Sequence, residues 1–544
     1  MANITEKEWH TIRTDSPGDS TYVVYVDDRE VASFNISSYG AGHFGGTEPS
    51  GNPNSMIPGG YHRSFAFGPW QDQAAWVRNV TAISRVTDKV LYENSMTSEE
   101  VLVEYGIQTN EEYVCSDAGK RDRYSWLGDR IISSRVTMVS TGEGEFVWGP
   151  ADQALSRQVS TGQIPINTLF SPLDTKGKLL RTSNVDPLLV DYNFDFLQVA
   201  YDYWLRSGND TFLDIHWQGM VSVSNYAMSR ALDPNTQLYG APTGPKGLPL
   251  SGQKVMVNAP GTANTVSMIL GLERLADMAE YLGKDGSADL WRQQAQLSRD
   301  AIDRLLWNST GGFYALNAGS ADYDLMDIAL ALVGGIGTRE RRVSVTKKLE
   351  ALKVPAGYMN GTRFVDTPLV VDPYYLSFLL EGLAKENETH LAQDLLDRTW
   401  LPMVRQDANF TGAYWEYLND DGTYPGLDLF SANSHFWGSY PTVFLTEYVL
   451  GVRPTKKGYL EFLFAPLPGF NTEWVHGRVP TPAGLIYAAW GYNSDGKIMM
   501  EIAIPKGLKG KVNPPFEGAY TLNGKNATSA SDITGGQTIT IVQL

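Results

Sequence analysis

The chain has 544 residues, of which 42% are hydrophobic and 19% charged, and its formal net charge is −17. This length suits two to four domains of roughly 100–200 residues each, with the composition of an ordinary globular protein. The acidic balance argues against nucleic-acid binding, because contacts to phosphates need clustered Lys and Arg. No apolar run approaches the ~18 residues of a membrane span.

Cys115 is the single cysteine, which excludes an internal disulfide and a cysteine-rich metal site. We expect its side chain to be a buried small hydrophobic group. The N-terminal residues show no apolar core of a signal peptide. Nine Asn-X-Ser/Thr sequons nevertheless favour a secreted, glycosylated protein, with a cytoplasmic location as the alternative. The sequons begin at Asn3, Asn35, Asn79, Asn209, Asn308, Asn360, Asn387, Asn409 and Asn526.

Residues 1–94 are predicted to form a β-rich domain. Thr21–Val26 has the alternation of a strand and precedes the turn-prone pair Asp27-Asp28. A stretch rich in Gly, Pro and Ser, Ser38–Gly60, predicts a long loop.

Residues 95–450 are predicted to be helical. Apolar side chains recur three or four positions apart from Val266 to Leu282 and from Phe194 to Trp204, and each pattern stops at a glycine. Asp372-Pro373 begins a further helix, with a capping residue followed by proline. Helices joined by short turns over this length either stack as a solenoid or close into a toroid. Because no fixed solenoid repeat is visible, we expect closure.

Residues 451–544 are predicted to form a small β-sandwich. The turn Asn493–Gly496 leads into an apolar strand that ends at Ile504. The turn Leu522–Lys525 and a last strand, Thr538–Val542, complete the chain. The predicted architecture is therefore multidomain, with an all-α centre between two β domains.

The segment Ser116–Asp129 combines three carboxylates, three cations and a tryptophan. Acids and bases beside an aromatic face are typical of carbohydrate sites. One carboxyl group then acts as a general acid, while another stays ionised and binds sugar hydroxyls. The alternative is a loop held by ion pairs, with the tryptophan packed beneath it. The residues concerned are Asp117, Lys120, Arg121, Asp122, Arg123, Trp126 and Asp129.

Two later motifs place polar side chains among aromatic ones. Glu416 lies between Trp415 and Tyr417, where its carboxylate can reach an anomeric carbon or the attacking water. His435 and Trp437 follow, and they can donate to a sugar hydroxyl and form a wall of the pocket. The alternative for Glu416 is an amphipathic element whose aromatic residues face a core and whose Glu faces water. The alternative for His435 is a structural histidine.

The sequence motifs of several other enzyme classes are absent from the chain. The seven histidines have no metal-ligand spacing, and Gly-x-Ser-x-Gly, P-loop and Rossmann fingerprints are missing. These absences argue against metal hydrolases, esterases, nucleotide-binding proteins and dehydrogenases. We therefore expect no metal and no cofactor.

In this order the three motifs resemble the α-L-rhamnosidases of glycoside hydrolase family 78, particularly the shorter fungal members. The resemblance covers about residues 110–470. It implies a central (α/α)6 toroid flanked by two β-sandwiches, with domains at 1–94, 95–450 and 451–544. The matching positions are Arg123, Trp126, Gly128, Asp129, Trp415-Glu416 and Asn433–His435.

The resemblance also implies an inverting mechanism with two carboxyl groups. Asp122 is then the general acid and Glu416 the general base. Asp122 stands where the family has Glu, so its carboxyl group is one methylene shorter, and Asp117 and Asp129 are the alternative acids. The residues expected to bind the sugar are Asp117, Arg121, Asp129, Trp126, Trp415, His435 and Trp437.

The expected substrate is a terminal α-L-rhamnosyl residue of a glycoside or of a plant polysaccharide side chain. The family's Asp-Trp pair is not visible near Leu248–Lys254, which leaves the sugar specificity open. Two other classes stay open as well. One is a related toroid enzyme on another glycan, including a polysaccharide lyase, and the other is a non-catalytic carbohydrate-binding homologue.

Overall fold

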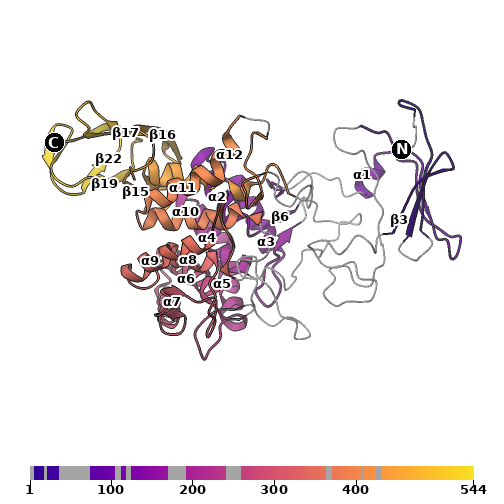
Figure 1. Cartoon of the computed structure of the whole chain (residues 1–544), viewed down its shortest axis with the longest axis horizontal. Coiled ribbons are helices and arrows are strands. Elements are labelled where there is room, and N and C mark those ends of the chain that lie inside the picture. The colour runs from indigo at the N-terminus through magenta and orange to yellow at the C-terminus, as the bar shows by residue number, and fades with distance from the viewer. Residues whose placement is uncertain are drawn as a thin grey trace. The chain divides into compact units, whose positions relative to one another are not determined.

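In this computed structural model the described residues are 5–16, 21–35, 74–104, 112–117, 124–168, 191–240, 259–362, 370–406, 409–423 and 431–544. The chain divides into two compact units, Met1–Gln108 and Thr109–Leu544 (Figure 1). Among the residues described, no helix is both long enough and apolar enough to cross a membrane.

The described part of the first unit is rich in strands. β1 (Ile12–Asp15), β2 (Thr21–Val26) and β3 (Arg29–Asn35) form an antiparallel sheet in that order. Asp27 and Asp28 have φ values of 49° and 62°, as in the mirror-image turn that joins two strands tightly. The strand predicted over residues 21–26 is thus confirmed.

Two further elements complete the described part of this unit. β4 (Val80–Ile83) and β5 (Val90–Asn94) form a separate hairpin, and α1 (Glu100–Glu104) follows it. The predicted loop Ser38–Gly60 lies outside the described residues. The sandwich implied for this part of the chain stays a prediction.

Six helices of the second unit form a closed series of contacts, in which each helix touches the next and the last touches the first. We call them the inner helices. All nine residues of the fourth are buried, because a helix that is apolar all round needs cover on every side. The inner helices are α2 (Arg130–Ser140), α4 (Asp191–Ser207), α6 (Thr262–Tyr281), α8 (Leu325–Val333), α10 (Pro373–Lys385) and α13 (Pro441–Phe444).

A second set of helices lies between the inner ones along the described parts of the chain, one in each interval except the last, which holds two (Figure 1). In the third of them the buried residues Trp291, Ala295 and Ser298 follow one another at helical spacing, as in a helix with one side in water. This arrangement agrees with the helical hairpins that the sequence predicts. The second set is α3 (Glu145–Ser156), α5 (Asp210–Arg230), α7 (Asp285–Leu305), α9 (Arg339–Thr346), α11 (Thr389–Leu395) and α12 (Leu401–Val404).

The helix ends follow the sequence signals. Gly208 and Gly283 lie just beyond α4 and α6, with φ values of +67° and +68°, in the left-handed region where glycine is favoured. Asp372 caps α10, because its carboxylate accepts a hydrogen bond from the Tyr374 backbone N–H at 2.9 Å. These predicted boundaries are confirmed.

Short antiparallel pairs of strands occur in the segments that join the helices, and each pair consists of two strands of two residues. They are β6 (Ser125–Trp126) with β7 (Asn167–Thr168), β8 (Trp307–Asn308) with β9 (Phe313–Tyr314), β10 (Lys353–Val354) with β11 (Gly357–Tyr358), and β12 (Val370–Val371) with β13 (Leu418–Asn419).

The C-terminal part of the second unit consists of two sheets. One has the strand order β14-β15-β19-β22, and the other has the order β16-β17-β18-β23-β20-β21. Ile498, Met500 and Ile502 on β18 are buried while the residues between them are not, which places one sheet face on a core. The strands are β14 (Val452–Pro454), β15 (Glu461–Phe464), β16 (Trp474–Thr481), β17 (Gly484–Tyr492), β18 (Ile498–Ile504), β19 (Lys509–Val512), β20 (Tyr520–Leu522), β21 (Lys525–Ala527), β22 (Ser531–Thr534) and β23 (Gln537–Gln543).

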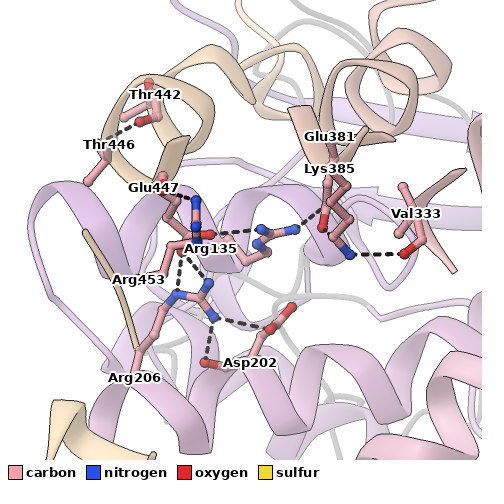
Figure 2. Close-up of polar contacts among 10 residues, drawn as sticks. All are labelled: Arg135, Asp202, Arg206, Val333, Glu381, Lys385, Thr442, Thr446, Glu447 and Arg453. Carbon is pink, nitrogen blue, oxygen red and sulfur yellow. Dashed lines mark hydrogen bonds and ion pairs between the residues drawn. The ribbon is translucent and has the colours of Figure 1, made fainter. Parts of the chain in front are cut away.

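A buried cluster of charges joins the inner helices to one another (Figure 2). Arg135 on α2 donates to Glu381 on α10 at 2.6 Å and to Glu447, just after α13, at 3.0 Å. Arg206 on α4 donates to the same Glu447 carboxylate and to Asp202, one turn earlier on α4. Four separate segments therefore meet at one set of ion pairs.

The charge cluster also reaches the C-terminal sheets. The backbone carbonyl of Glu447 accepts a hydrogen bond from Arg453 on β14 at 2.7 Å (Figure 2). Burial by itself raises the pKa of Glu447, but Arg206 and Arg135 outweigh burial and hold the pKa below its usual range. Glu447 is therefore an ionised group that connects three parts of the second unit.

We expect Glu447→Gln to lower the free energy of unfolding by about 3–5 kcal/mol, because it removes the one carboxylate that both buried guanidinium groups share. The folded-state pKa of Glu447 is depressed, so its contribution is present above the unfolded pKa of about 4.3 and is lost as the pH falls through the folded value. Urea denaturation at pH 7 and at pH 3 measures this, and the gap between wild type and variant shrinks at pH 3.

The matched control is Glu461→Gln, which removes an ion pair of 2.8 Å to Lys456 between two exposed side chains. Its cost should stay below about 1 kcal/mol. Equal losses for the two variants at pH 7 would contradict the importance of the buried cluster.

Candidate active site

The acidic segment is held at both of its ends. The Asp117 backbone N–H donates to the Tyr124 carbonyl at 3.0 Å, and Ser125-Trp126 pairs with Asn167-Thr168 as β6 and β7. Between these ties lie residues 118–123, outside the described residues. Arg121 and Asp122, the expected general acid, are among them, so their roles stay predictions.

Arg130 holds this segment in place through two hydrogen bonds. Its Nη2 donates to the Cys115 carbonyl and, at 3.0 Å, to the Ser125 hydroxyl. Its guanidinium carbon lies 4.9 Å from the centre of the Phe436 ring. Arg130 therefore connects the acidic segment to the histidine motif.

The side chain of Cys115 is exposed, so the expectation of a buried thiol is wrong. The reason is that its segment is held through the backbone carbonyl, which accepts from Arg130, while the side chain points outward. Alternation with neighbouring apolar residues does not predict which face of an irregular segment is covered.

Asp129, Glu416 and His435 come together although they are far apart in the sequence. His435 Nε2 lies 3.9 Å from Asp129 Oδ2 and 3.9 Å from Glu416 Oε1. The exposed fractions of the three residues are only 2%, 1% and 3%. Asp129 directly precedes α2, while Glu416 and His435 come from the segments before α13. We call these three residues the acid–histidine cluster.

The orientation of Glu416 is fixed by the backbone. Its Oε2 accepts from the Ala432 N–H at 2.7 Å, and its own N–H donates to the Ala432 carbonyl at 3.1 Å. His435 is held similarly, because its N–H donates to the Tyr414 carbonyl at 2.9 Å. Rigid placement of this kind suits a group that must meet a reacting atom at one distance.

The predicted aromatic residues differ in where they lie. The Trp437 ring centre is 4.4 Å from that of His435, and its indole N–H donates to the Glu416 carbonyl at 3.1 Å. Trp415 is fully buried, with its indole N–H donating to Thr411. Trp126 is half-buried, with its ring centre 6.2 Å from that of Tyr124. Trp437 thus packs directly against the cluster, Trp415 lies in the core, and Trp126 keeps an accessible face.

Further acidic residues lie near the cluster. The sequence analysis did not name them as residues of the site. Asp372 is buried, and its pKa is raised to about 8, first by burial and then by the nearby charge of Glu416. Burial also raises the pKa of Tyr192 far above its usual value, with Asp129 and Asp191 adding to the shift. The sequence did contain a signal for Asp191 and Asp195. Two acidic residues four positions apart share one face of a helix.

Gly128 gives the family's Trp-x-Gly-Asp motif a physical explanation. A Cβ atom at this position would lie 1.9 Å from Cε1 of Tyr192, a distance no side chain tolerates. The Tyr192 ring therefore packs directly on the backbone next to Asp129. In the described ranges no group of three His, Cys, Asp or Glu side chains is arranged to hold a metal ion.

Two family models match the chain. The bacterial alpha-L-rhamnosidase 6 hairpin glycosidase domain matches residues 100–449, and the bacterial alpha-L-rhamnosidase C-terminal domain matches residues 451–529. The chain belongs to the family 78 α-L-rhamnosidases. The family resemblance drawn from the motifs is confirmed, and the shorter fungal type stays a prediction.

Curated relatives are similar over part of their length. An α-L-rhamnosidase of Alteromonas sp. (strain LOR) is 26% identical over 195 residues, which are 34% of this chain and 20% of the relative. An α-L-rhamnosidase of Formosa agariphila is 21% identical over 284 residues, 49% of this chain and 29% of the relative. The matched region thus spans less than a third of either relative.

Solved structures show the same rhamnosidase fold. The family 78 rhamnosidase of Bacillus sp. GL1 superimposes with a TM-score of 0.59 at 21% identity, covering 76% of this chain and 41% of that one. The α-L-rhamnosidase of Streptomyces avermitilis, solved with L-rhamnose, gives a TM-score of 0.59 at 15% identity, covering 82% and 42%. The helical domain followed by a β domain is therefore shared.

We expect Gly128→Ala to lower the free energy of unfolding by about 1–3 kcal/mol, because the added methyl group forces Tyr192 away from the backbone. Gly286→Ala is the matched control. It lies in the first turn of α7 with nothing within 4 Å of its Cβ position, and we expect it to be neutral or stabilising by about 0.4–1 kcal/mol. Thermal unfolding of both variants measures this, and equal stabilities would refute the tight contact.

Proposed function

We propose that this chain is an inverting α-L-rhamnosidase that releases terminal α-L-rhamnosyl residues from glycosides or polysaccharide side chains. The observation that carries the proposal is the acid–histidine cluster, in a chain of the rhamnosidase family. In the same proposal the inner helices and the second set of helices form an (α/α)6 toroid, and the cluster lies where the inner helices begin.

Glu416 is the proposed general base. One oxygen is held by the Ala432 N–H, while the other faces His435, so both oxygens of the carboxylate have a fixed direction. Such a carboxylate activates water on one face of the sugar, and the general acid protonates the glycosidic oxygen from the opposite side. In inverting enzymes the two carboxyl groups are about 6.5–9.5 Å apart, which leaves room for the water.

The remaining residues have binding roles in this proposal. Asp117, Arg121, Asp129 and His435 hold sugar hydroxyls, and Trp126 and Trp437 are the walls. Asp122 remains the proposed acid, one methylene shorter than the Glu of the family.

An extracellular location is also a proposal. Its support is the acidic net charge and the sequons, of which Asn79, Asn387, Asn409 and Asn526 are exposed.

We expect Glu416→Gln to fold normally, because an amide oxygen can still accept from Ala432, and to lower kcat on 4-nitrophenyl α-L-rhamnoside by about 10²–10⁴-fold. The control is Glu501→Gln on the C-terminal sheet, an exposed residue, which should keep the wild-type rate. A wild-type rate for the Glu416 variant would refute its assignment. Tight rhamnose binding without turnover by the wild type would favour the non-catalytic homologue.

A comparison of Asp122→Asn with Asp117→Asn identifies the acid. Protonation matters most for a basic leaving group, so the variant lacking the acid should lose about 10²–10⁴-fold on methyl α-L-rhamnoside and distinctly less on the 4-nitrophenyl substrate. We expect this leaving-group dependence for Asp122→Asn, and an equal loss on both substrates for Asp117→Asn. The reverse pattern would assign the acid to Asp117.

A further inference from the structure

A cavity lies far from the acid–histidine cluster. Its volume is about 850 Å³, and it opens between the C-terminal ends of α2 and α4, the start of α3 and the turn that joins β16 to β17. Its lining includes Tyr113, Glu145, Trp148, Tyr203 and Thr481. Concave sites of this size at the junction of two structural layers are where ligands usually bind.

The cavity is separated from the proposed chemistry by the length of the inner helices. Asp129 and Asp191 lie at the first turns of α2 and α4, whereas the cavity is lined by Thr141 and Ser207 at their other ends. At 1.5 Å per residue the two helices of 11 and 17 residues span roughly 16 and 25 Å. A ligand in this cavity does not touch the acid–histidine cluster.

The aromatic side of the cavity is formed by Trp148 and Tyr113. The half-buried Trp148 ring packs edge-on against Tyr203 and Phe212, with ring centres 6.3 and 5.6 Å apart. Tyr113 stands beside it with an exposed fraction of 63%, edge-on to Phe146 at 5.5 Å. A Cβ at Gly149 would lie 2.3 Å from the Tyr113 carbonyl, so this glycine allows the Tyr113 backbone to lie directly against α3.

The polar side offers donors and acceptors. The Tyr203 hydroxyl accepts from the Asn209 amide at 3.1 Å, and a hydroxyl group can donate as well as accept. Burial raises the pKa of Tyr203; Asn209 and Ser207 act against this, and the charge of Glu145 adds to it, so the phenol stays protonated. The exposed Glu145 carboxylate contributes acceptors at the rim.

The charges of the lining restrict the ligand. Among its described residues Arg206 is the one cation, and this guanidinium is already bound to Glu447 and Asp202. Glu112 and Glu145 leave the cavity negative, which disfavours anions. Flat aromatic faces beside hydroxyl donors and carboxylate acceptors suit a ring with apolar C–H faces and many hydroxyl groups.

We propose that this cavity is a second, non-catalytic binding site for a neutral oligosaccharide, stacked on Tyr113 and Trp148 and hydrogen-bonded to Glu145 and Tyr203. Such a site would hold one part of a glycan on the enzyme while another part of the same glycan is hydrolysed. The proposal does not depend on the chemistry of Glu416.

The test uses the full chain and neutral pentasaccharides of rhamnan, galactan, arabinan and xylan, each titrated by calorimetry in the presence of saturating L-rhamnose. We expect at least one pentasaccharide to bind, and Tyr113→Ala and Glu145→Gln each to weaken it by about tenfold, which corresponds to 1.4 kcal/mol. Because both side chains are exposed, either variant suffices if the other unfolds.

Tyr487→Ala is the matched control. Tyr487 is 52% exposed on the outer face of the C-terminal sheet, so this variant should bind like the wild type. All three variants should keep kcat/KM on 4-nitrophenyl α-L-rhamnoside within about twofold of wild type.

Two results would overturn the proposal. Either no pentasaccharide binds, or both pocket variants bind the pentasaccharide as the wild type does. If the wild type fails to hydrolyse the aryl rhamnoside, the proposed rhamnosidase function fails, and the calorimetry still decides about the cavity.

Discussion

The second unit depends on a few charges buried where its helices meet. Arg135 joins α2 to α10 and to the segment after α13, and Arg206 adds α4 through the shared Glu447. An unpaired ion in such a place costs several kcal/mol, so these segments cannot slide past one another without losing a partner. The carbonyl of Glu447 also binds Arg453, so the same constraint extends to the C-terminal sheets.

A fixed set of inner helices explains how the acid–histidine cluster can exist. Asp129 stands before one inner helix, while Glu416 and His435 come from segments before another, so their separation depends on the spacing between helices. Each is then held locally by backbone contacts, such as the Ala432 N–H on Glu416. The buried charges fix the spacing between the inner helices. The backbone contacts of the loops then fix the positions of the Glu416 and His435 side chains.

The sequence predicts elements whose cause is local. Gly208 beyond α4, Asp372 before α10 and the turn of Asp27-Asp28 act within a few residues, and they appear where expected. Motif order was enough to identify the family and to select Glu416 and His435. It did not reveal that Asp372 lies near Glu416, where burial and the charge of Glu416 raise the pKa of Asp372. It also missed the exposure of Cys115. The motifs also did not distinguish Trp415, which lies in the core, from Trp437, which contacts His435. In both motifs aromatic residues stand beside a polar one.

We propose that this chain inverts the anomeric centre with Glu416 as base, and the configuration of the first product distinguishes inversion from retention. Proton NMR of the wild type acting on 4-nitrophenyl α-L-rhamnoside, recorded before mutarotation, should show β-L-rhamnose first and the α anomer only later. Initial release of α-L-rhamnose would mean a covalent intermediate and a second carboxyl group too close to admit water. That result would contradict the account.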